Sequence, residues 1–247
     1  LKKAYEVLTE EKDEAKALDL VTKQLRETPD NVDALILRTR LLRRKHEFGQ
    51  ALQDINHALK VNKPKKSNVQ NSTLHWWKAY IYQDMGDWQS AAASFKTAYE
   101  LAQKDDKDNL QSISFDYAQA LFNLDDYDGA DVIYNKMLAL DEADQAAMIG
   151  LARNMVTREQ YKDALELLDK CQKYDADYAE IYRFKMQAYD KLVDTNKAID
   201  AGLDWFDKND DANTEAILKV LVKRPNYAEA SLKSRAKKSE SPFQWKA

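Results

Sequence analysis

The stretch "MGDWQSAAASFKTAYEL", residues 85–101, carries the pattern that decides the fold. A turn-like Gly-Asp pair precedes Trp88, the small residue Ala91 follows three positions later, and apolar residues return at Phe95 and Ala98. Residues three and four positions apart lie on the same face of an α-helix. The stretch therefore predicts a turn that leads into a helix, together with the buried face of that helix.

The same surroundings recur around six alanines, which are separated by 34, 40, 39, 34 and 34 residues: Ala17, Ala51, Ala91, Ala130, Ala164 and Ala198. A large apolar residue lies about nine positions before each alanine, and an aromatic residue often lies three positions before it. Short breaks such as "HEF", "GDW" and "DDY" separate two helical halves. A fixed period of this length is the signature of a repeat architecture. Each repeat is predicted to be two antiparallel helices, with insertions between some repeats.

Composition agrees with an all-helical chain. The 247 residues include only 5 Gly and 4 Pro, fewer turn residues than a β protein of this length needs. The net charge of −4 and the pI near 5.6 give no global reason to expect nucleic acid or an anionic membrane as partner. Cys171 is the single cysteine, which excludes an intramolecular disulfide. No apolar run approaches the roughly 20 residues needed to span a bilayer.

With these features the chain resembles the tetratricopeptide repeat family over nearly its whole length. "MGDWQSAAASFKTAYEL" and "LDDYDGADVIYNKMLALD" (residues 124–141) match the family pattern well, and Pro29 supplies one proline at the end of a second helix. The first and sixth repeats depart most, with Glu14 and Thr195 at the aromatic position. The resemblance implies an all-α, right-handed α-solenoid of about six helix-turn-helix repeats plus C-terminal capping helices.

The register predicts where the repeats begin and end. Six repeats occupy residues 1–211, at about 1–31, 32–65, 72–105, 111–144, 145–178 and 179–211. Residues 212–247 are expected to form capping helices and a tail anchored by Phe243 and Trp245. Two connections exceed the family norm: "NKPKKSNVQNST" (62–73) and "AQKDDKDNLQS" (102–112). Each is expected to be an exposed loop or an extension of the preceding helix, with a partner-contacting insertion as the alternative.

In this family the first helix of every repeat lines the concave side of the superhelix, and the resemblance places ligand contacts there. Applied to this sequence, it predicts the following groove residues: Arg40, Arg43, Arg44, Trp76, Tyr80, Phe115, Gln119, Phe122, Arg153 and Arg183. The rings would form an apolar floor and the arginines would orient a peptide, since Trp and Arg are enriched in binding hot spots. The alternative is that the rings only pack neighbouring helices and the arginines form a solvated face. Trp77 stays undecided, and Trp88 and Tyr82 take core positions.

The best-known peptide mode of the family, a carboxylate clamp, is not matched. Lys2 corresponds to the expected lysine, but Glu6 replaces an asparagine, and Thr73 and Trp77 replace the basic pair of the third repeat. The chaperone-tail function of that clamp is therefore not assigned to this chain.

No catalytic or metal-binding motif is present in the sequence. His46, His57 and His75 lie in different helices or turns, and no cysteine pair accompanies them. A Gly-rich phosphate loop and a nucleophile–base motif are also missing. We therefore expect no enzyme activity, no cofactor and no metal.

The function that the sequence favours is a non-enzymatic scaffold that binds a protein or peptide segment in the concave groove. Two alternatives remain at this stage: an RNA-binding helical-repeat protein, and an accessory or oligomerisation domain of a longer enzyme. The start at Leu1 instead of Met suggests a processed or truncated chain. A soluble protein without a membrane span is expected, in the cytoplasm or the periplasm. The partner and the oligomeric state are not indicated.

Overall fold

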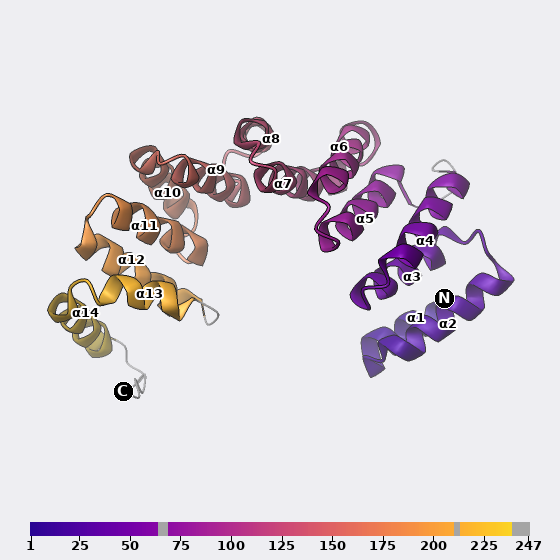
Figure 1. The fold of residues 1–247 in the computed structure, drawn as a ribbon, viewed down its shortest axis with the longest axis horizontal. Coiled ribbons are helices and arrows are strands. Elements are labelled where there is room, and N and C mark those ends of the chain that lie inside the picture. Colours follow the sequence, from indigo (N-terminus) through magenta and orange to yellow (C-terminus); the bar gives the residue numbers. More distant parts are fainter. Residues whose placement is uncertain (64–68, 210–212, 239–247) are drawn as a thin grey trace. The chain divides into compact units, whose positions relative to one another are not determined.

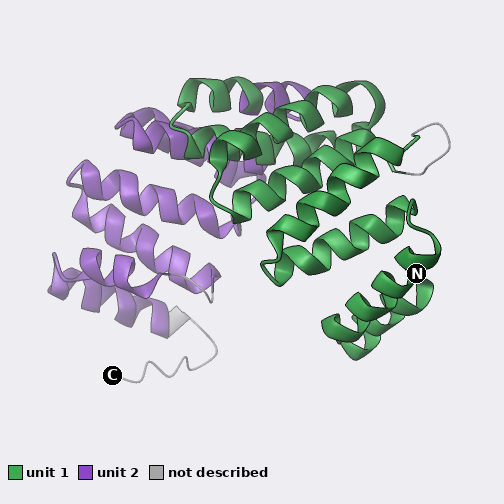
Figure 2. Ribbon diagram, turned by 45° about the vertical axis from the view of Figure 1, so that its right-hand side comes forward, with its two compact units in different colours: residues 1–133 green, residues 134–247 purple. Residues whose placement is uncertain are grey.

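The computed structural model describes residues 1–63, 69–209 and 213–238. Within these ranges the regular secondary structure is helical throughout (Figure 1). The chain divides into two compact units, unit 1 (residues 1–133) and unit 2 (residues 134–247), which Figure 2 colours separately. Unit 1 contains α1 (Lys2–Glu6), the π-helical segment η1 (Val7–Glu11), α2 (Glu14–Glu27), α3 (Val32–Arg44), α4 (Phe48–Val61), α5 (Asn71–Asp84), α6 (Trp88–Asp105), α7 (Lys107–Asn123) and the start of α8 (Tyr127–Leu140). Unit 2 holds the rest of α8, then α9 (Gln145–Thr157), α10 (Tyr161–Tyr174), α11 (Ala179–Lys191), α12 (Thr195–Lys208), α13 (Thr214–Leu221) and α14 (Pro225–Lys238).

Helices that follow one another in the chain pack as pairs. In unit 1, α3 packs on α4 and α5 on α6, while the first helices of successive pairs also meet, α3 with α5 and α5 with α7 (Figure 1). In unit 2, α9 packs on α10, α11 packs on α12, and α9 meets α11. This is the arrangement of a helical repeat solenoid, so the predicted fold class is confirmed.

The six periodic alanines occupy one structural position. Each is the fourth residue of the second helix of its pair, and each has no exposed surface: Ala17, Ala51, Ala91, Ala130, Ala164 and Ala198. The distance between packed helices depends on the side chains at their contact, and a methyl group permits a close approach. The alanine period therefore marks the positions at which the two helices of each pair contact each other.

The turn within each pair is also built alike. The residue two positions before each second helix has a positive φ, between 55° and 62° at the five non-glycine positions and 76° at Gly86: Lys12, His46, Gly86, Asp125, Glu159 and Val193. An aspartate then caps several of the helices; Asp87, for example, accepts from the backbone N–H of Ser90 at 3.0 Å. A left-handed residue followed by an N-cap reverses the chain in very few residues.

The connection 102–112 is taken up almost entirely by helix. Helix α6 extends to Asp105 and α7 already begins at Lys107, so the predicted extension of the preceding helix is correct and an exposed loop does not form. Asp106 lies buried at the junction, where its carboxylate accepts from the Ser72 hydroxyl at 2.6 Å and from Asn109 Nδ2 at 2.9 Å. In the connection 62–73, residues 64–68 lie outside the described ranges.

Helices α13 and α14 close the core of unit 2. They contribute Ile217, Val220 and Ala228 to the hydrophobic cluster that α9–α12 build around Met148, Leu168 and other residues. Covering the last apolar face is what a capping segment must do in a repeat array. The tail residues predicted as its anchor, Phe243 and Trp245, lie outside the described residues.

Candidate functional site

Rings and arginines gather where α3, α5 and α7 meet in unit 1. Helix α3 contributes arginines, α5 contributes three rings and a carboxylate, and α7 contributes a second carboxylate. We call this set the ring–arginine cluster: Arg40, Arg43, Trp76, Trp77, Tyr80, Asp84 and Asp116. All three helices are the first helices of their pairs, which is the face where the sequence places ligand contacts.

The three rings of the cluster form one packed group. The ring centroids of Trp76 and Trp77 each lie 5.7 Å from that of Tyr80, and 6.4 Å from each other. Tyr80 also meets the buried ring of Phe95 edge-on at 5.6 Å. All three rings stay half-buried, so part of each remains accessible. The core thus fixes the positions of the three rings, while part of the surface of each ring faces solvent.

Asp116 holds the polar edges of two of these rings. Trp76 Nε1 donates to Asp116 Oδ2 at 2.7 Å, and the Tyr80 hydroxyl donates to the same oxygen. Burial raises the pKa of the Asp116 carboxyl, while the two hydrogen bonds act in the opposite direction. Burial, followed by the hydrogen bond to Asp116, raises the pKa of the Tyr80 hydroxyl. Tyr80 therefore remains a hydrogen-bond donor at neutral pH, and both rings are locked in place.

The arginines of α3 lie over the rings of α5. The Arg40 Cζ atom is 5.0 Å from the ring centroid of Trp77, and the Arg43 Cζ atom is 5.6 Å from Trp77 and 5.0 Å from Tyr80. Arg43 Nε also pairs with Asp84 at 2.9 Å, whereas its Nη1 is buried and has no hydrogen-bond partner among the described residues. Cation–π contacts of this kind are worth about 0.5–2 kcal/mol, depending on exposure.

Three members of the cluster are not among the predicted site residues: Trp77, Asp84 and Asp116. Trp77, which the register left undecided, lies under both arginines and packs against the core cluster of α1–α5. Asp116 was missed, although a carboxylate beside the predicted ring position Phe115 was an available signal. Its partners Trp76 and Tyr80 lie 40 and 36 residues away, which sequence periodicity alone does not connect.

The other predicted residues of unit 1 differ in their surroundings. Arg44 is exposed and pairs with Glu14 of the second helix α2. Phe122 packs on Tyr127 of α8 with a centroid distance of 5.3 Å. Phe115 and Gln119 are half-buried on α7, and Gln119 Oε1 is buried with no hydrogen-bond partner in the part of the chain that the structure describes. The structure thus brings Arg40, Arg43, Trp76 and Tyr80 into one cluster, whereas Arg44 and Phe122 contact second helices.

Arg153 and Arg183 belong to unit 2. Arg153 Nη2 donates to the hydroxyl of Tyr134 at 3.2 Å, and the Arg183 Cζ atom lies 4.2 Å from the ring centroid of Phe184. Arg183 is also paired with Glu180 of its own helix. Burial lowers the pKa of Arg153, and the nearby charge of Arg183 lowers it further. The two guanidinium groups therefore lie close enough for the charge of one to affect the other.

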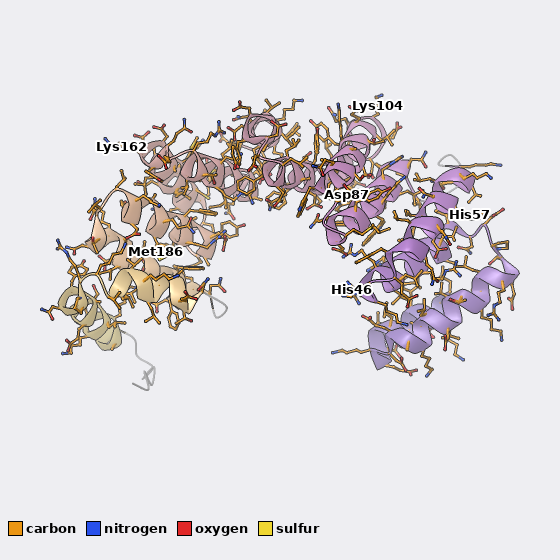
Figure 3. The ribbon with its side chains drawn as sticks, in the orientation of Figure 1. His46, His57, Asp87, Lys104, Lys162 and Met186 are labelled. Carbon is orange, nitrogen blue, oxygen red and sulfur yellow. The ribbon has the colours of Figure 1, made fainter. Side chains whose placement is uncertain are left out.

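The histidines and the cysteine do not form a reactive site. His46 lies in the turn after α3 and His57 on α4 (Figure 3), where His57 Nε2 is 2.8 Å from Asp30. Burial lowers the pKa of His75 and raises that of the Cys171 thiol to about 11, so Cys171 is not a thiolate at neutral pH. In the part of the chain that the structure describes, no group of three or more His, Cys, Asp or Glu side chains could hold a metal ion.

A model of the tetratricopeptide repeat family matches residues 121–188, from the end of α7 through most of α11. Over this range the chain is similar to tetratricopeptide repeat proteins. No curated protein matches it by sequence. Members of this family bind protein partners and are generally non-enzymatic scaffolds. Over the described ranges, no helix of this chain is both long enough and apolar enough to cross a membrane.

Solved structures share its fold at low sequence identity. A tetratricopeptide repeat protein from Parabacteroides merdae ATCC 43184 is 18% identical with a TM-score of 0.72, covering 99% of this chain and 92% of that one. PilW, a widely conserved type IV pilus biogenesis factor, is 16% identical with a TM-score of 0.69 over 89% and 96% of the two chains. YrrB, a TPR protein with an unusual peptide-binding site, is 16% identical with a TM-score of 0.56 over 81% and 96%. These likenesses extend to the fold alone.

Proposed function

We propose that this chain is a non-enzymatic scaffold that binds an extended or helical segment of a partner protein across α3, α5 and α7. The observation that carries the proposal is the ring–arginine cluster, in which half-buried rings are tied to Asp116 and covered in part by arginines. Aromatic and arginine side chains together are the usual hot spots of protein interfaces. The cluster therefore has the composition of a binding floor.

The cluster is also prepared for binding before the partner arrives. Trp76 and Tyr80 have lost most of their rotamer freedom, because Asp116 fixes their polar edges and Phe95 supports the ring of Tyr80. Ordering a mobile side chain on binding costs on the order of 1 kcal/mol. A partner that packs on these two rings avoids most of that cost. Preorganisation of this kind raises affinity without any additional contact.

The proposed surface continues beyond the cluster onto α7. Phe115 adds a further half-buried ring, and the half-buried Gln119 carries an amide that can bond the backbone of a bound segment once its side chain turns outward. Phe122 remains at the edge of this surface, and Arg44 at its other end. Arg153 and Arg183 are proposed as a separate contact region of unit 2, and the division into six repeats and a capping segment is kept as part of the proposal.

The test uses peptides selected on the protein itself. Random peptides of about 12 residues, long enough to span neighbouring helices, are selected by phage display, and the tightest binder is labelled for fluorescence anisotropy. Trp76→Ala combined with Phe115→Ala is expected to weaken binding by at least about tenfold, because two ring contacts are lost. Val132→Ala on the second helix α8, where the side chain is 53% exposed, is the matched control and should leave binding unchanged.

Circular dichroism separates binding from folding. Unchanged helicity of the double variant, together with lost binding, supports the proposal. Unchanged binding by a folded double variant would show that the peptides bind elsewhere and would exclude this face as the site. If the double variant unfolds, the milder Trp76→Phe, which keeps a ring but removes the donor to Asp116, is measured in its place.

A further inference from the structure

The four arginines of α3 differ in how their charge is balanced. Three of them are paired with a carboxylate: Arg38 with Asp54, Arg43 with Asp84 and Arg44 with Glu14. Arg40 makes no ion pair and no hydrogen bond in the described residues; its contact is the face of Trp77, at 5.0 Å. One guanidinium of this helix therefore lacks a counterion.

The burial of Arg40 makes the lack of a counterion energetically unfavourable. Arg40 is half-buried, and removing a cation from water without a matching anion costs free energy that one cation–π contact only partly offsets. A guanidinium stacked on a ring keeps its N–H donors free at the edge of its plane. Those donors fit the two oxygens of a carboxylate side by side. Arg40 is thus oriented for bidentate recognition.

The two carboxylates already in the cluster do not balance the charge of Arg40. Asp84 is engaged by Arg43 Nε at 2.9 Å, and Asp116 accepts from Trp76 and Tyr80. Arg43 contributes a further positive charge over the same Trp77 ring, and its Nη1 is a buried donor that no described residue accepts from. The anion that would balance the cluster is therefore supplied from outside the described residues.

We infer that the bound segment is acidic: a carboxylate of the partner pairs with Arg40 while a neighbouring apolar side chain packs on the rings beside Trp77. This inference rests on the proposed function, because it names the chemistry of the segment that binds the same face. The carboxylate comes from an Asp or Glu side chain or from the C-terminus of the partner, and the experiment distinguishes these sources.

The probe is the tightest peptide from the phage selection, synthesised with a free and with an amidated C-terminus. Each acidic residue is replaced in turn by its amide, and binding to the wild type, Arg40→Gln and Arg40→Lys is measured by fluorescence anisotropy. One replacement is expected to lower the affinity for the wild type on the order of tenfold, as expected for a charge-assisted hydrogen bond. The same replacement should have no effect on Arg40→Gln, since the two changes remove one interaction.

Further variants define the contact. Arg40→Lys keeps the charge but not the planar stack on Trp77, and is expected to bind with intermediate affinity. Lys45→Gln is the control, because Lys45 directly follows the same helix, is paired with Glu47 and lies outside the proposed binding surface, and it should bind like the wild type. Arg40→Gln is expected to unfold at the same or a higher urea concentration than the wild type, since it removes an unbalanced charge. If amidation alone abolishes the dependence on Arg40, the carboxylate is the C-terminus.

The two proposals fail in different ways. Peptides that lose binding to the Trp76 and Phe115 double variant but bind Arg40→Gln as tightly as the wild type overturn the acidic partner and leave the proposed function intact. Selected peptides that lack acidic residues and bind equally well with a free and with an amidated C-terminus do the same. Peptides that are indifferent to the double variant overturn the proposed function and the acidic partner together.

Discussion

At the scale of single residues, the turns place unequal strain on their left-handed position. Val193 has φ 62° and is 82% exposed, so its β-branched side chain adopts an unfavourable backbone region without gaining any packing. Val193→Gly is therefore expected to raise the free energy of unfolding by about 1 kcal/mol, measured by urea denaturation.

Gly86 supplies the opposite test at the equivalent turn. It has φ 76°, and a Cβ atom added there meets nothing within 4 Å. A side chain at this position is therefore disfavoured only by the left-handed backbone conformation. Gly86→Ala should lower the free energy of unfolding by about 1 kcal/mol. Equal stability of Val193→Gly and the wild type would show that the turn relaxes around valine.

Gly150 is required for a different reason. A Cβ atom at this position of α9 would lie 2.2 Å from Cζ of Tyr134, whose ring is fully buried. We predict that Gly150→Ala lowers the free energy of unfolding by about 2 kcal/mol, because overpacking outweighs the roughly 1 kcal/mol gained in helix propensity. Gly49→Ala, where nothing lies within 4 Å, is the control and should not destabilise. An unchanged free energy of unfolding for Gly150→Ala would mean that the Tyr134 ring can shift to make room for the added methyl group.

Asp116 is expected to make stability depend on pH. Burial raises the pKa of its carboxyl in the folded state, so the folded protein binds more protons than the unfolded chain above pH 3.8. The stability from this group is then present below that pH and lost as the pH rises through the folded pKa. The difference in unfolding free energy between the wild type and Asp116→Asn should fall as the pH rises above 3.8 and through the raised pKa of the folded state. A difference that increases instead would show that the hydrogen bonds from Trp76 and Tyr80 dominate over burial.

At the scale of elements, one ion pair joins the two helices of a hairpin. Arg38 of α3 donates to Asp54 of α4 through Nε and Nη2, both at 2.6 Å, and the side chains are 25% and 9% exposed. Asp54→Ala leaves the guanidinium without its counterion and is expected to cost about 3 kcal/mol in urea unfolding. The apolar pair Arg38→Met with Asp54→Leu should stay within about 1 kcal/mol of the wild type.

The exposed pair of Lys219 and Glu215 on α13 is the control for this prediction. Its side chains are 72% and 78% exposed, so Glu215→Ala should cost less than about 0.5 kcal/mol. A similar cost for Asp54→Ala would show that water solvates Arg38 as well as it solvates a surface lysine.

The elements that could be predicted from sequence are those whose signal is local and repeated. The alanine period predicted the second helices because each alanine must fit a helix crossing, and all six proved fully buried. The junction at Asp106 had no such local signal, since the Asp106 carboxylate is held by Ser72 of α5, 34 residues earlier in the chain. The link from Asp116 to Trp76 and Tyr80 is likewise a tertiary hydrogen-bond network. A periodic pattern identifies the face on which a residue lies, and not the residue that it meets there.

At the scale of the whole molecule, a repeat array derives its stability from contacts between neighbouring elements. Helix α14 illustrates this at the C-terminal end of the described chain. Arg235 Nη1 lies 2.8 Å from the carboxylates of Asp204 and Asp207, and its Nη2 donates to the carbonyl of Asp200 at 3.2 Å. One side chain therefore joins α14 to three positions of α12.

Arg235→Ala tests whether this effect remains local. Removing the guanidinium leaves two carboxylates of α12 without their partner and frees α14 to open on its own. Amide hydrogen exchange followed by mass spectrometry should then show faster exchange in α12–α14 and unchanged exchange in α3–α6, because contacts in such an array are made with the next element. Lys233→Ala on the same helix, where Lys233 is 70% exposed, should change neither region. Faster exchange along the entire chain would instead identify a single cooperative folding unit, in which the last helix stabilises the first.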